Sequence, residues 1–326
     1  MLRRVLERLL QSLFVLWAAF TISFFVLFVL PSDPVSLMLG QGGDGGVANT
    51  AEADAVRAQY GFDRPVVVQY LERLWAFARL DLGTSLQDKQ PVAQLLGDAL
   101  PATLQLALTA MALASLLGAG IAVAASTTRL SWLRQILLSL PPLSVSLPPF
   151  WIGLLLIQLF SFQLRLLPSM GDSSWQSLIL PAVTLAVPAS AVVAQVLAKS
   201  FLATWRQPFV QLAQAKGLSR GEILRKHVFR NAIIPAVTMA AIIFGNLLAG
   251  TVVVETVFSR TGIGRTVESA VTQQDIPVVQ AVVVLSAVIF VVVNLAVDAV
   301  YPLLDPRIVR RRRKSRAAQE DRVAHV

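Results

Sequence analysis

The sequence predicts an all-α membrane protein with six transmembrane helices and with both termini on the cytoplasmic side. Three observations support this prediction: the composition, the number of long apolar runs, and the uneven distribution of Lys and Arg. Of the 326 residues, 55% are hydrophobic and only 14% are charged, whereas soluble proteins average about 25% charged residues. Such a composition is typical of a chain whose main solvent is the bilayer.

Six apolar runs are long enough to cross a bilayer, because a membrane-spanning helix needs about 20 residues. The predicted spans are Leu9–Leu30, Ala102–Ala125, Gln135–Phe160, Trp175–Ala198, Pro235–Phe258 and Val278–Leu304.

The orientation follows from the charges that flank these spans. With both termini inside, 20 of the 28 Lys and Arg residues are cytoplasmic, while 12 of the 19 acidic residues are extracytoplasmic and two lie within the spans. Positively charged segments resist translocation, so we expect the N-in, C-in arrangement.

The first span resembles a secretory signal in its basic start. Its apolar run is too long, however, and no small-x-small cleavage site precedes Pro31, so we interpret it as a retained signal anchor.

The following segment, Pro31–Ala99, is then extracytoplasmic, with a short helix that ends before Gly61 and an amphipathic helix over Val66–Leu80. The apolar residues of the second helix recur at helical spacing opposite Glu72, Arg73 and Arg79. These apolar residues are Val67, Tyr70, Leu71, Leu74 and Phe77. We expect them to pack on the protein's own core, with the membrane surface or a partner as alternatives.

The third span is rich in proline and serine. Prolines remove backbone donors, so this helix must be kinked or interrupted. Broken backbone at membrane depth is tolerated where it is packed in protein or lines a wet cavity. The residues assigned to a candidate translocation path are Ser144, Ser146 and Pro148, together with Asn246 of the fifth span. A kink that serves packing alone remains an equal alternative.

Two carboxylates, Glu255 and Asp298, lie inside the predicted spans. Ionisable residues within a membrane are costly and often functional. Both lie near the end of their span, so a structural role remains open for each.

The connection between the fourth and fifth spans is long and basic. Residues Lys199 to Ile234 carry seven basic side chains and one acidic one, yet their pattern predicts two short helices. The first ends at Lys216, before Gly217, a residue type that caps helices in the left-handed conformation. The second begins with Ser219 and Glu222, the spacing of a capping box, and Pro235 opens the next apolar segment.

This loop resembles the "EAA" loop of ABC importer permeases, in the dipeptide, oligopeptide and nickel branch. Gly217 matches the signature glycine and Ala213 its second alanine, while Gln211 and Leu212 depart from the pattern. Further similar segments are Leu30–Pro34, Gly61–Pro65, Asp81–Leu86, Val254–Phe258 and Leu304–Ile308. The resemblance implies that the following residues form an ATPase-coupling loop: Gln211, Leu212, Ala213, Lys216, Gly217, Ser219, Glu222, His227, Arg230, Asn231 and Pro235.

The resemblance also implies a function and partners. The chain would be the permease subunit of an ATP-driven importer in the bacterial inner membrane, moving peptides or, alternatively, nickel, metal chelates or glutathione. It would pair with a second, homologous permease, two cytosolic ATPase subunits that bind ATP, and an extracytoplasmic solute-binding protein. The expected division is a signal anchor and extracytoplasmic segment over residues 1–99, a permease core over 100–305, and a basic tail over 306–326.

Several function classes are disfavoured by what the sequence lacks. No GxxxxGK[ST] phosphate-binding loop is present, and no cysteine and only two histidines are available for catalysis or metal binding. We therefore expect neither an enzyme nor a bound cofactor. The net charge of +9 lies mostly in membrane-flanking segments, which favours contact with anionic lipids over nucleic acid. The remaining rivals are an ion-coupled secondary transporter and a membrane anchor that does not transport.

Overall fold

The computed structural model describes residues 2–29 and 64–304, and these residues form helices joined by turns and loops. The chain divides into two compact units, which are described separately. Unit 1 comprises Met1–Thr103 and Arg260–Val291, and unit 2 comprises Leu104–Ser259 and Val292–Val326. Two of the boundaries between the units fall inside helices, α5 and α14.

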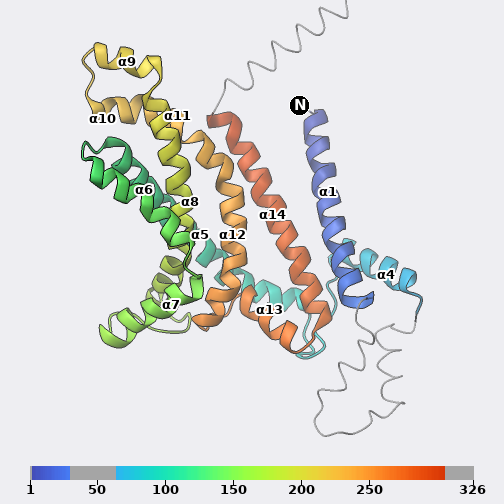
Figure 1. Ribbon diagram of the computed structural model, residues 1–326. Helices are drawn as coiled ribbons and strands as arrows, with labels where there is room; N and C mark the ends of the chain where they lie inside the picture. The colour runs from blue at the N-terminus through green and yellow to red at the C-terminus, as the bar shows by residue number, and fades with distance from the viewer. Residues whose placement is uncertain (1, 30–63, 305–326) are drawn as a thin grey trace, which may run out of the picture. The chain divides into compact units, whose positions relative to one another are not determined.

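Unit 1 is built from helices at both ends of the chain (Figure 1). They are α1 (Leu2–Phe24) with the π-helical turn η1 (Phe25–Val29), α4 (Val66–Ala78), the start of α5 (Val92–Thr127), α13 (Ile263–Thr272) and most of α14 (Ile276–Leu304). One apolar cluster joins α5, α13 and α14, centred on the buried Val92, Val278 and Ala281. An aromatic cluster around Phe20 and Phe24 joins α1 to α4.

Unit 2 holds the remaining helices around α8. They are α6 (Ser131–Val145), α7 (Pro149–Leu156) with η2 (Ile157–Gln163), η3 (Trp175–Leu178), α8 (Ile179–Trp205), α9 (Pro208–Ala215), α10 (Arg220–Ile223), η4 (Leu224–Val228), α11 (Phe229–Ala232) and α12 (Ile234–Val257). Half of α8 is buried, because small residues and leucines cover most of its faces.

Small residues bring the helices of unit 2 close together. A Cβ atom built on Gly118 of α5 would lie 2.7 Å from both the Ser190 carbonyl oxygen and Val193 Cβ of α8. Likewise, a Cβ on Gly153 of α7 would lie 3.1 Å from the ring of Phe258 and 3.4 Å from the methyl group of Thr184. Close backbone approach of this kind is a common way to pack helices in a membrane.

Each predicted span coincides with an apolar helix or a pair of helices, with adjusted bounds. Within the described residues, five helices are long and apolar enough to cross a membrane, and a broken pair, Ser131–Ser144 with Pro149–Gln163, can supply the sixth. Helix α5 begins at Val92 and not at Ala102, because Val92, Leu96 and Ala99 bury an apolar face at helical spacing.

The predicted interruption of the third span is also confirmed. The two halves of the pair are bent by 105°, and the break has a local cause. Pro148 precedes Pro149, and a residue before proline is pushed towards an extended conformation. Pro148 indeed has φ −62° and ψ 134°, and Pro149 then starts α7.

The amphipathic helix expected after the first span exists as α4, but only part of its apolar stripe packs on the protein. Val67 and Leu71 are 69% and 57% exposed. Helix α13 was not expected, because it is short and carries polar residues between two apolar spans. The short helix expected before Gly61, the basic tail and the side chain of Asp298 lie outside what the structure describes.

Candidate functional site

The loop α9–α11, residues 208–232, begins with a helix whose end is defined by Gly217. Gly217 has φ +79°, and its N–H donates to the Gln214 carbonyl at 2.9 Å while the Leu218 N–H donates to the Ala213 carbonyl at 3.2 Å. These two bonds form a Schellman motif, which satisfies the last carbonyls of α9 and turns the chain back. The helix ends at Ala215 with Lys216 as its cap, as the sequence predicts.

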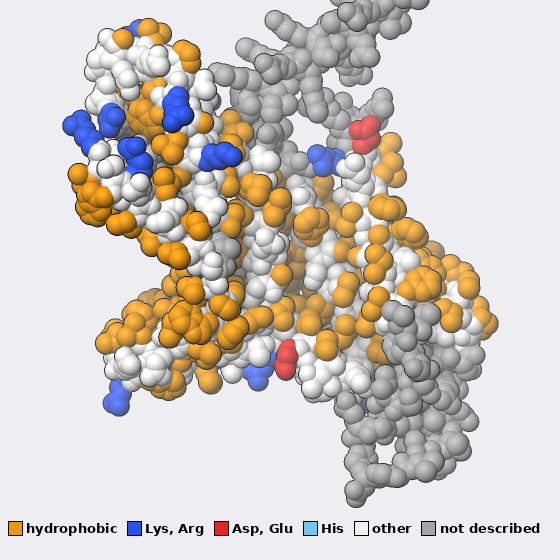
Figure 2. Space-filling view, viewed as in Figure 1, with side chains coloured by type: hydrophobic (Ala, Val, Ile, Leu, Met, Phe, Trp, Pro, Cys, Tyr) orange, Lys and Arg blue, Asp and Glu red, His pale blue; other side chains and the backbone are white. Residues whose placement is uncertain are grey.

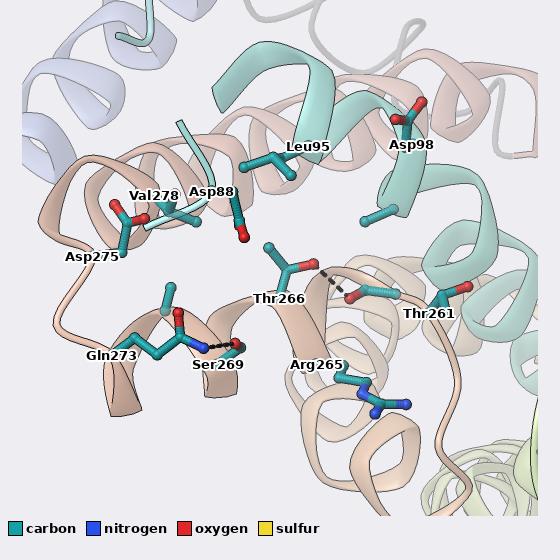
Figure 3. A pocket seen from close by; sticks show the side chains of 13 residues that line it. Asp88, Leu95, Asp98, Thr261, Arg265, Thr266, Ser269, Gln273, Asp275 and Val278 are labelled. Atoms are coloured by element: carbon teal, nitrogen blue, oxygen red, sulfur yellow. Dashed lines mark hydrogen bonds between the residues drawn. The ribbon is translucent and has the colours of Figure 1, made fainter. Parts of the chain in front are cut away.

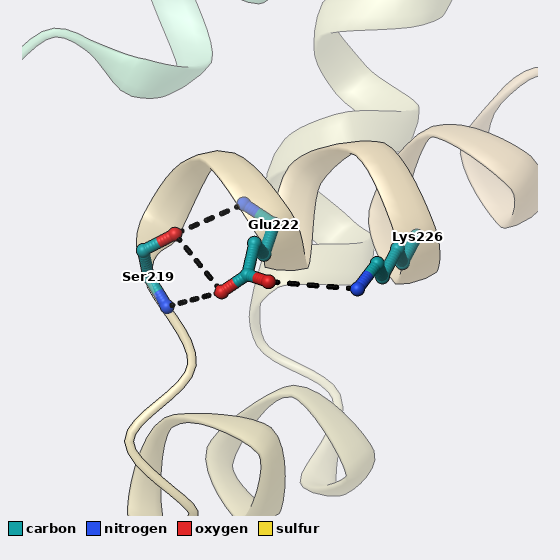
Figure 4. Close-up of polar contacts among 3 residues, drawn as sticks. All are labelled: Ser219, Glu222 and Lys226. Atoms are coloured by element: carbon teal, nitrogen blue, oxygen red, sulfur yellow. Dashed lines mark hydrogen bonds and ion pairs between the residues drawn. The ribbon is translucent and has the colours of Figure 1, made fainter.

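The next helix starts with the predicted capping box (Figure 4). Ser219 Oγ accepts the N–H of Glu222 at 3.3 Å, and the Ser219 N–H donates to Glu222 Oε2 at 3.3 Å. Lys226 lies 3.5 Å from Glu222 Oε1, one turn further on. The backbone N–H of Ser219 is the main cause that lowers the pKa of the Glu222 carboxyl, with Lys226 contributing.

After this start the loop continues through consecutive helical segments, α10, η4 and α11, into α12. A π-helical turn, η4, separates α10 from α11, and Asn231 Nδ2 donates to the His227 carbonyl at 2.7 Å. Helix α11 ends at Ala232, and Pro235 lies in the first turn of α12, where its missing N–H costs nothing.

The inner face of the α9–α11 loop is part of the main core of unit 2. Val210, Ile223, Val228 and Ala232 are fully buried and join the same apolar cluster as Phe201 of α8. The ring of Phe229 lies 6.0 Å from that of Phe201. Since these buried side chains come from every helix of the loop, the loop is fixed to the end of α8 and would move with it.

The outer face of the loop combines apolar and basic groups. Phe209 and Leu212 are 41% and 58% exposed. Further exposed residues of the loop are Gln211, Lys216, Arg220, Arg225, Lys226 and Arg230. Figure 2 shows several Lys and Arg side chains gathered at this end of unit 2. An apolar patch bordered by cations is suited to contact with another protein.

The residues expected along a translocation path lie at the broken span and on α12. The backbone N–H of Ser146 donates a hydrogen bond to the Leu143 carbonyl at 3.2 Å, and its hydroxyl donates to the Pro142 carbonyl at 3.1 Å. The Ser144 hydroxyl donates to the Leu140 carbonyl at 3.2 Å. Ser146, Pro148 and Asn246 are exposed, and Ser144 is half-buried. The hydroxyl oxygens can still accept hydrogen bonds at an interrupted helix.

Glu255 lies near the end of α12 and is fully buried, with an interaction partner within the fold. This environment fits the structural interpretation that the sequence leaves open.

One polar site in unit 1 was missed by the sequence analysis. Asp275, which is 2% exposed, accepts hydrogen bonds at Oδ2 from Ser85 Oγ, from the Leu86 N–H at 3.1 Å and from the Gln87 N–H at 3.3 Å. It thereby ties the loop before α5 to the start of α14. Asp275 also borders a pocket of about 370 Å³, whose lining includes Asp88, Asp98 and Arg265 (Figure 3). The partners of Asp275 are almost 190 residues away, so no local pattern indicates them.

Comparison with known families gives two matches that together cover most of the chain. Residues 116–310 match the model of the binding-protein-dependent transport system inner membrane component, and residues 1–107 match the N-terminal model of such membrane components.

Curated relatives extend over nearly the whole chain. The glutathione transport system permease protein GsiC of Salmonella typhi is 37% identical over 308 residues, covering 94% of this chain and 99% of the relative. A protein of Brucella suis, whose name assigns it to a peptide transport system as a permease, is 35% identical over 312 residues, covering 93% and 98%.

Solved structures share the fold at low identity. The inward-facing MetNI methionine ABC transporter matches with a TM-score of 0.58 at 18% identity, covering 66% of this chain and 98% of that one. An amino acid ABC transporter solved with histidines matches with a TM-score of 0.51 at 18% identity, covering 64% and 94%.

Proposed function

Because the chain belongs to the family of binding-protein-dependent transport system inner membrane components and is an ABC importer permease subunit of the inner membrane, we propose that it forms part of a translocation path for small peptides, glutathione included. The observation that carries the substrate proposal is the 37% identity over 94% of the chain to a glutathione permease, together with the 35% identity over 93% to a peptide permease. Glutathione is itself a tripeptide, so both names describe one chemical class. Nickel and metal chelates are the alternative substrates, but no specific observation favours them.

In this proposal the α9–α11 loop transmits movements of the ATPase subunits, driven by ATP hydrolysis, to the membrane spans. Two cytosolic ATPase subunits bind the nucleotide, and one of them docks on the exposed face of the loop around Phe209 and Leu212. The chain itself binds no cofactor and performs no chemistry. The charge pattern supports this side as cytoplasmic, because the loop carries seven basic residues and one acidic residue between Lys199 and Ile234.

The packing of the loop supports a mechanical role. Val210 and Ala213 on the inner face of α9 are buried in the cluster that includes Phe201 and Leu197 of α8. A displacement of α9 by an ATPase would therefore be passed to α8, and through the continuous path of α10 and α11 to α12. Cores of this kind do not deform gradually, so the expected response is a switch between two packings of the spans.

The nucleotide can shift the equilibrium between the two packings of the spans only if the ATPases bind these packings with different affinity. Opening of the path to either side then needs no ion gradient. The second permease subunit supplies the opposite wall of the path, and the solute-binding protein delivers the peptide from the extracytoplasmic side.

Uptake into proteoliposomes tests this proposal. The complete transporter is reconstituted with its solute-binding protein, and uptake of radiolabelled glutathione, a labelled tripeptide and ⁶³Ni²⁺ is measured with and without internal ATP. We expect ATP-dependent uptake of glutathione or the tripeptide, each competing with the other. Uptake of nickel alone would refute the substrate class, and uptake driven by an ion gradient without ATP would refute the importer mechanism for this chain.

A further inference from the structure

Helix α4 has an apolar arc that is wider than its contact with the protein. At 100° per residue, Tyr70, Leu74 and Phe77 occupy one side of this arc and pack against the aromatic cluster of α1. Val67, Leu71 and Trp75 continue the arc and are 69%, 57% and 61% exposed. Glu72 and Arg79 begin the polar face beyond Trp75.

The packed side of α4 fixes its level along α1. The Tyr70 hydroxyl accepts a hydrogen bond from Trp17 Nε1 at 2.9 Å and lies 2.9 Å from Thr21 Oγ1. Its ring is 5.4 Å from that of Phe24. Trp17 is in the middle of the candidate span Leu6–Phe28, about 16 Å from its end at a rise of about 1.5 Å per residue. The hydrocarbon core is about 30 Å thick, so Tyr70 reaches well inside one leaflet, and its hydroxyl is satisfied there by α1.

The surface of α1 at this level is itself suited to lipid. Ile22, Phe25 and Val26 are exposed by 64%, 49% and 48%, and only 17% of the span is buried within the protein. The ring of Phe24 packs on Tyr70 and that of Phe28 on Arg73, so α4 itself lies beside the last turns of this span, near the boundary of the hydrocarbon core. The uncovered face of α1 at this level is apolar as well.

The charged groups of α4 are held close to the helix. Arg64 pairs with Glu72 at 2.6 Å, the Arg79 guanidinium lies 4.7 Å from the centre of the Trp75 ring, and that of Arg73 lies 4.0 Å from the centre of the Phe28 ring. Burial lowers the pKa of Arg73 to about 10, opposed by the nearby charge of Glu72, so Arg73 remains charged at neutral pH. Basic residues on one face with Trp and Leu on the other are typical of helices that lie at the boundary between headgroups and acyl chains.

We propose that α4 is an interfacial helix, with Val67, Leu71 and Trp75 immersed in phospholipid acyl chains and with Glu72 and Arg79 among the headgroups. It adds a horizontal anchor to the vertical span α1. This assignment goes beyond the transport function and does not depend on the substrate. That the leaflet is the outer one rests on the topology proposed above, whereas the contact with lipid does not.

Site-directed spin labelling tests this proposal, because the chain has no cysteine of its own. Leu71→Cys and Glu72→Cys are labelled with a nitroxide in the assembled transporter, in vesicles of phosphatidylethanolamine and phosphatidylglycerol. Collision rates with oxygen, which concentrates in lipid, and with a water-soluble nickel chelate are then measured. Val26→Cys on α1 provides the lipid-facing reference.

We expect the ratio of oxygen to nickel collision rates at position 71 to match that at position 26 and to exceed that at position 72 several-fold. A ratio at position 71 as low as that at position 72 would show that water covers this face. Low rates with both reagents would show that a partner subunit or the binding protein covers it, and either result overturns the proposal. Val67→Cys repeats the measurement one turn away in case the Leu71 variant fails to assemble, and ATP-driven uptake by each labelled transporter is recorded separately.

Discussion

Ser219 and Glu222 each accept the backbone N–H of the other residue, and this reciprocal pair starts the helix that follows Gly217. The pair lies at the turn between α9 and α10, where the proposed ATPase-docking face changes direction. Loss of these two hydrogen bonds should therefore make the α9–α11 loop less ordered without affecting the membrane spans.

Replacing Ser219 with Ala removes the side-chain acceptor of the cap. Loss of such a cap costs about 1 kcal/mol, so we expect faster amide exchange in residues 219–232, measured by hydrogen exchange and mass spectrometry. Ser174, which caps η3 in the same manner, supplies the control. Ser174→Ala should leave exchange in the loop unchanged, and equal exchange in the Ser219 variant and the wild type would contradict the role assigned to the cap.

The same cap should depend on pH. The folded-state pKa of Glu222 lies below its ordinary value, chiefly because the carboxylate accepts the Ser219 N–H. The stabilisation is thus present above the ordinary pKa and is lost as the pH falls through the lowered value. Glu222→Gln keeps an acceptor at this position but cannot titrate. We expect loop exchange in the wild type, relative to this variant, to accelerate on acidification, and parallel pH profiles would show that the carboxylate contributes nothing.

Close packing between α5 and α8 should make Gly118 intolerant of a side chain. A Cβ there would lie 2.7 Å from backbone of α8, and overpacking of this kind typically costs about 1–3 kcal/mol. Gly118→Ala should lower the melting temperature of the purified complex. Gly120, one position beyond Ala119 on the same helix, has open space within 4 Å of where its Cβ would lie, so Gly120→Ala should melt like the wild type. Equal melting of both variants would contradict the packing.

The serines of the broken span should contact water. Ser144→Cys and Ser146→Cys should react with a small polar thiol reagent at rates that depend on the nucleotide state of the ATPases. Leu140, which is exposed on the unbroken part of α6, offers a control, since Leu140→Cys should react at a rate that the nucleotide does not change. Inertness at both serine positions in every nucleotide state would remove these residues from the proposed path.

The tail after Asp305 should be cytoplasmic. A fluorescent or enzymatic reporter that is active only in the cytoplasm, fused after Val326, should be active in cells, while a periplasmic reporter at the same position should not be. The opposite pattern would invert the topology, and the charge distribution would then need another explanation.

Structural features that are determined by neighbouring residues could be predicted from the sequence, whereas features that depend on distant residues could not. The helix ends at Gly217 and Ser219 follow from residue types within a few positions, and the break at Pro148 follows from two adjacent prolines. Asp275 could not be assigned in this way, because its donors come from residues 85–87, which only the folded chain brings near. Helix α4 is an intermediate case: its amphipathic pattern is visible in the sequence, but which side packs on α1 depends on the contacts of Tyr70 with Trp17 and Thr21.

The α9–α11 loop is proposed to couple ATP hydrolysis to movement of the spans, and Gly217 offers the most direct test of this role. Gly217 has φ +79°, and a Cβ added to it would meet nothing within 4 Å. A β-branched residue would therefore meet backbone strain there without a steric clash in the core, at a cost of roughly 1–3 kcal/mol. Gly221, on α10, likewise has open space but no positive φ, so Gly221→Val is the matched control.

The decisive measurement is ATP-driven peptide uptake in proteoliposomes by the Gly217→Val transporter, alongside co-purification of its ATPase subunits. We predict that the variant reaches the membrane at a near-normal level and that uptake collapses, whereas the Gly221→Val control transports normally. Undiminished ATP-dependent uptake by Gly217→Val would show that this loop is not the coupling element.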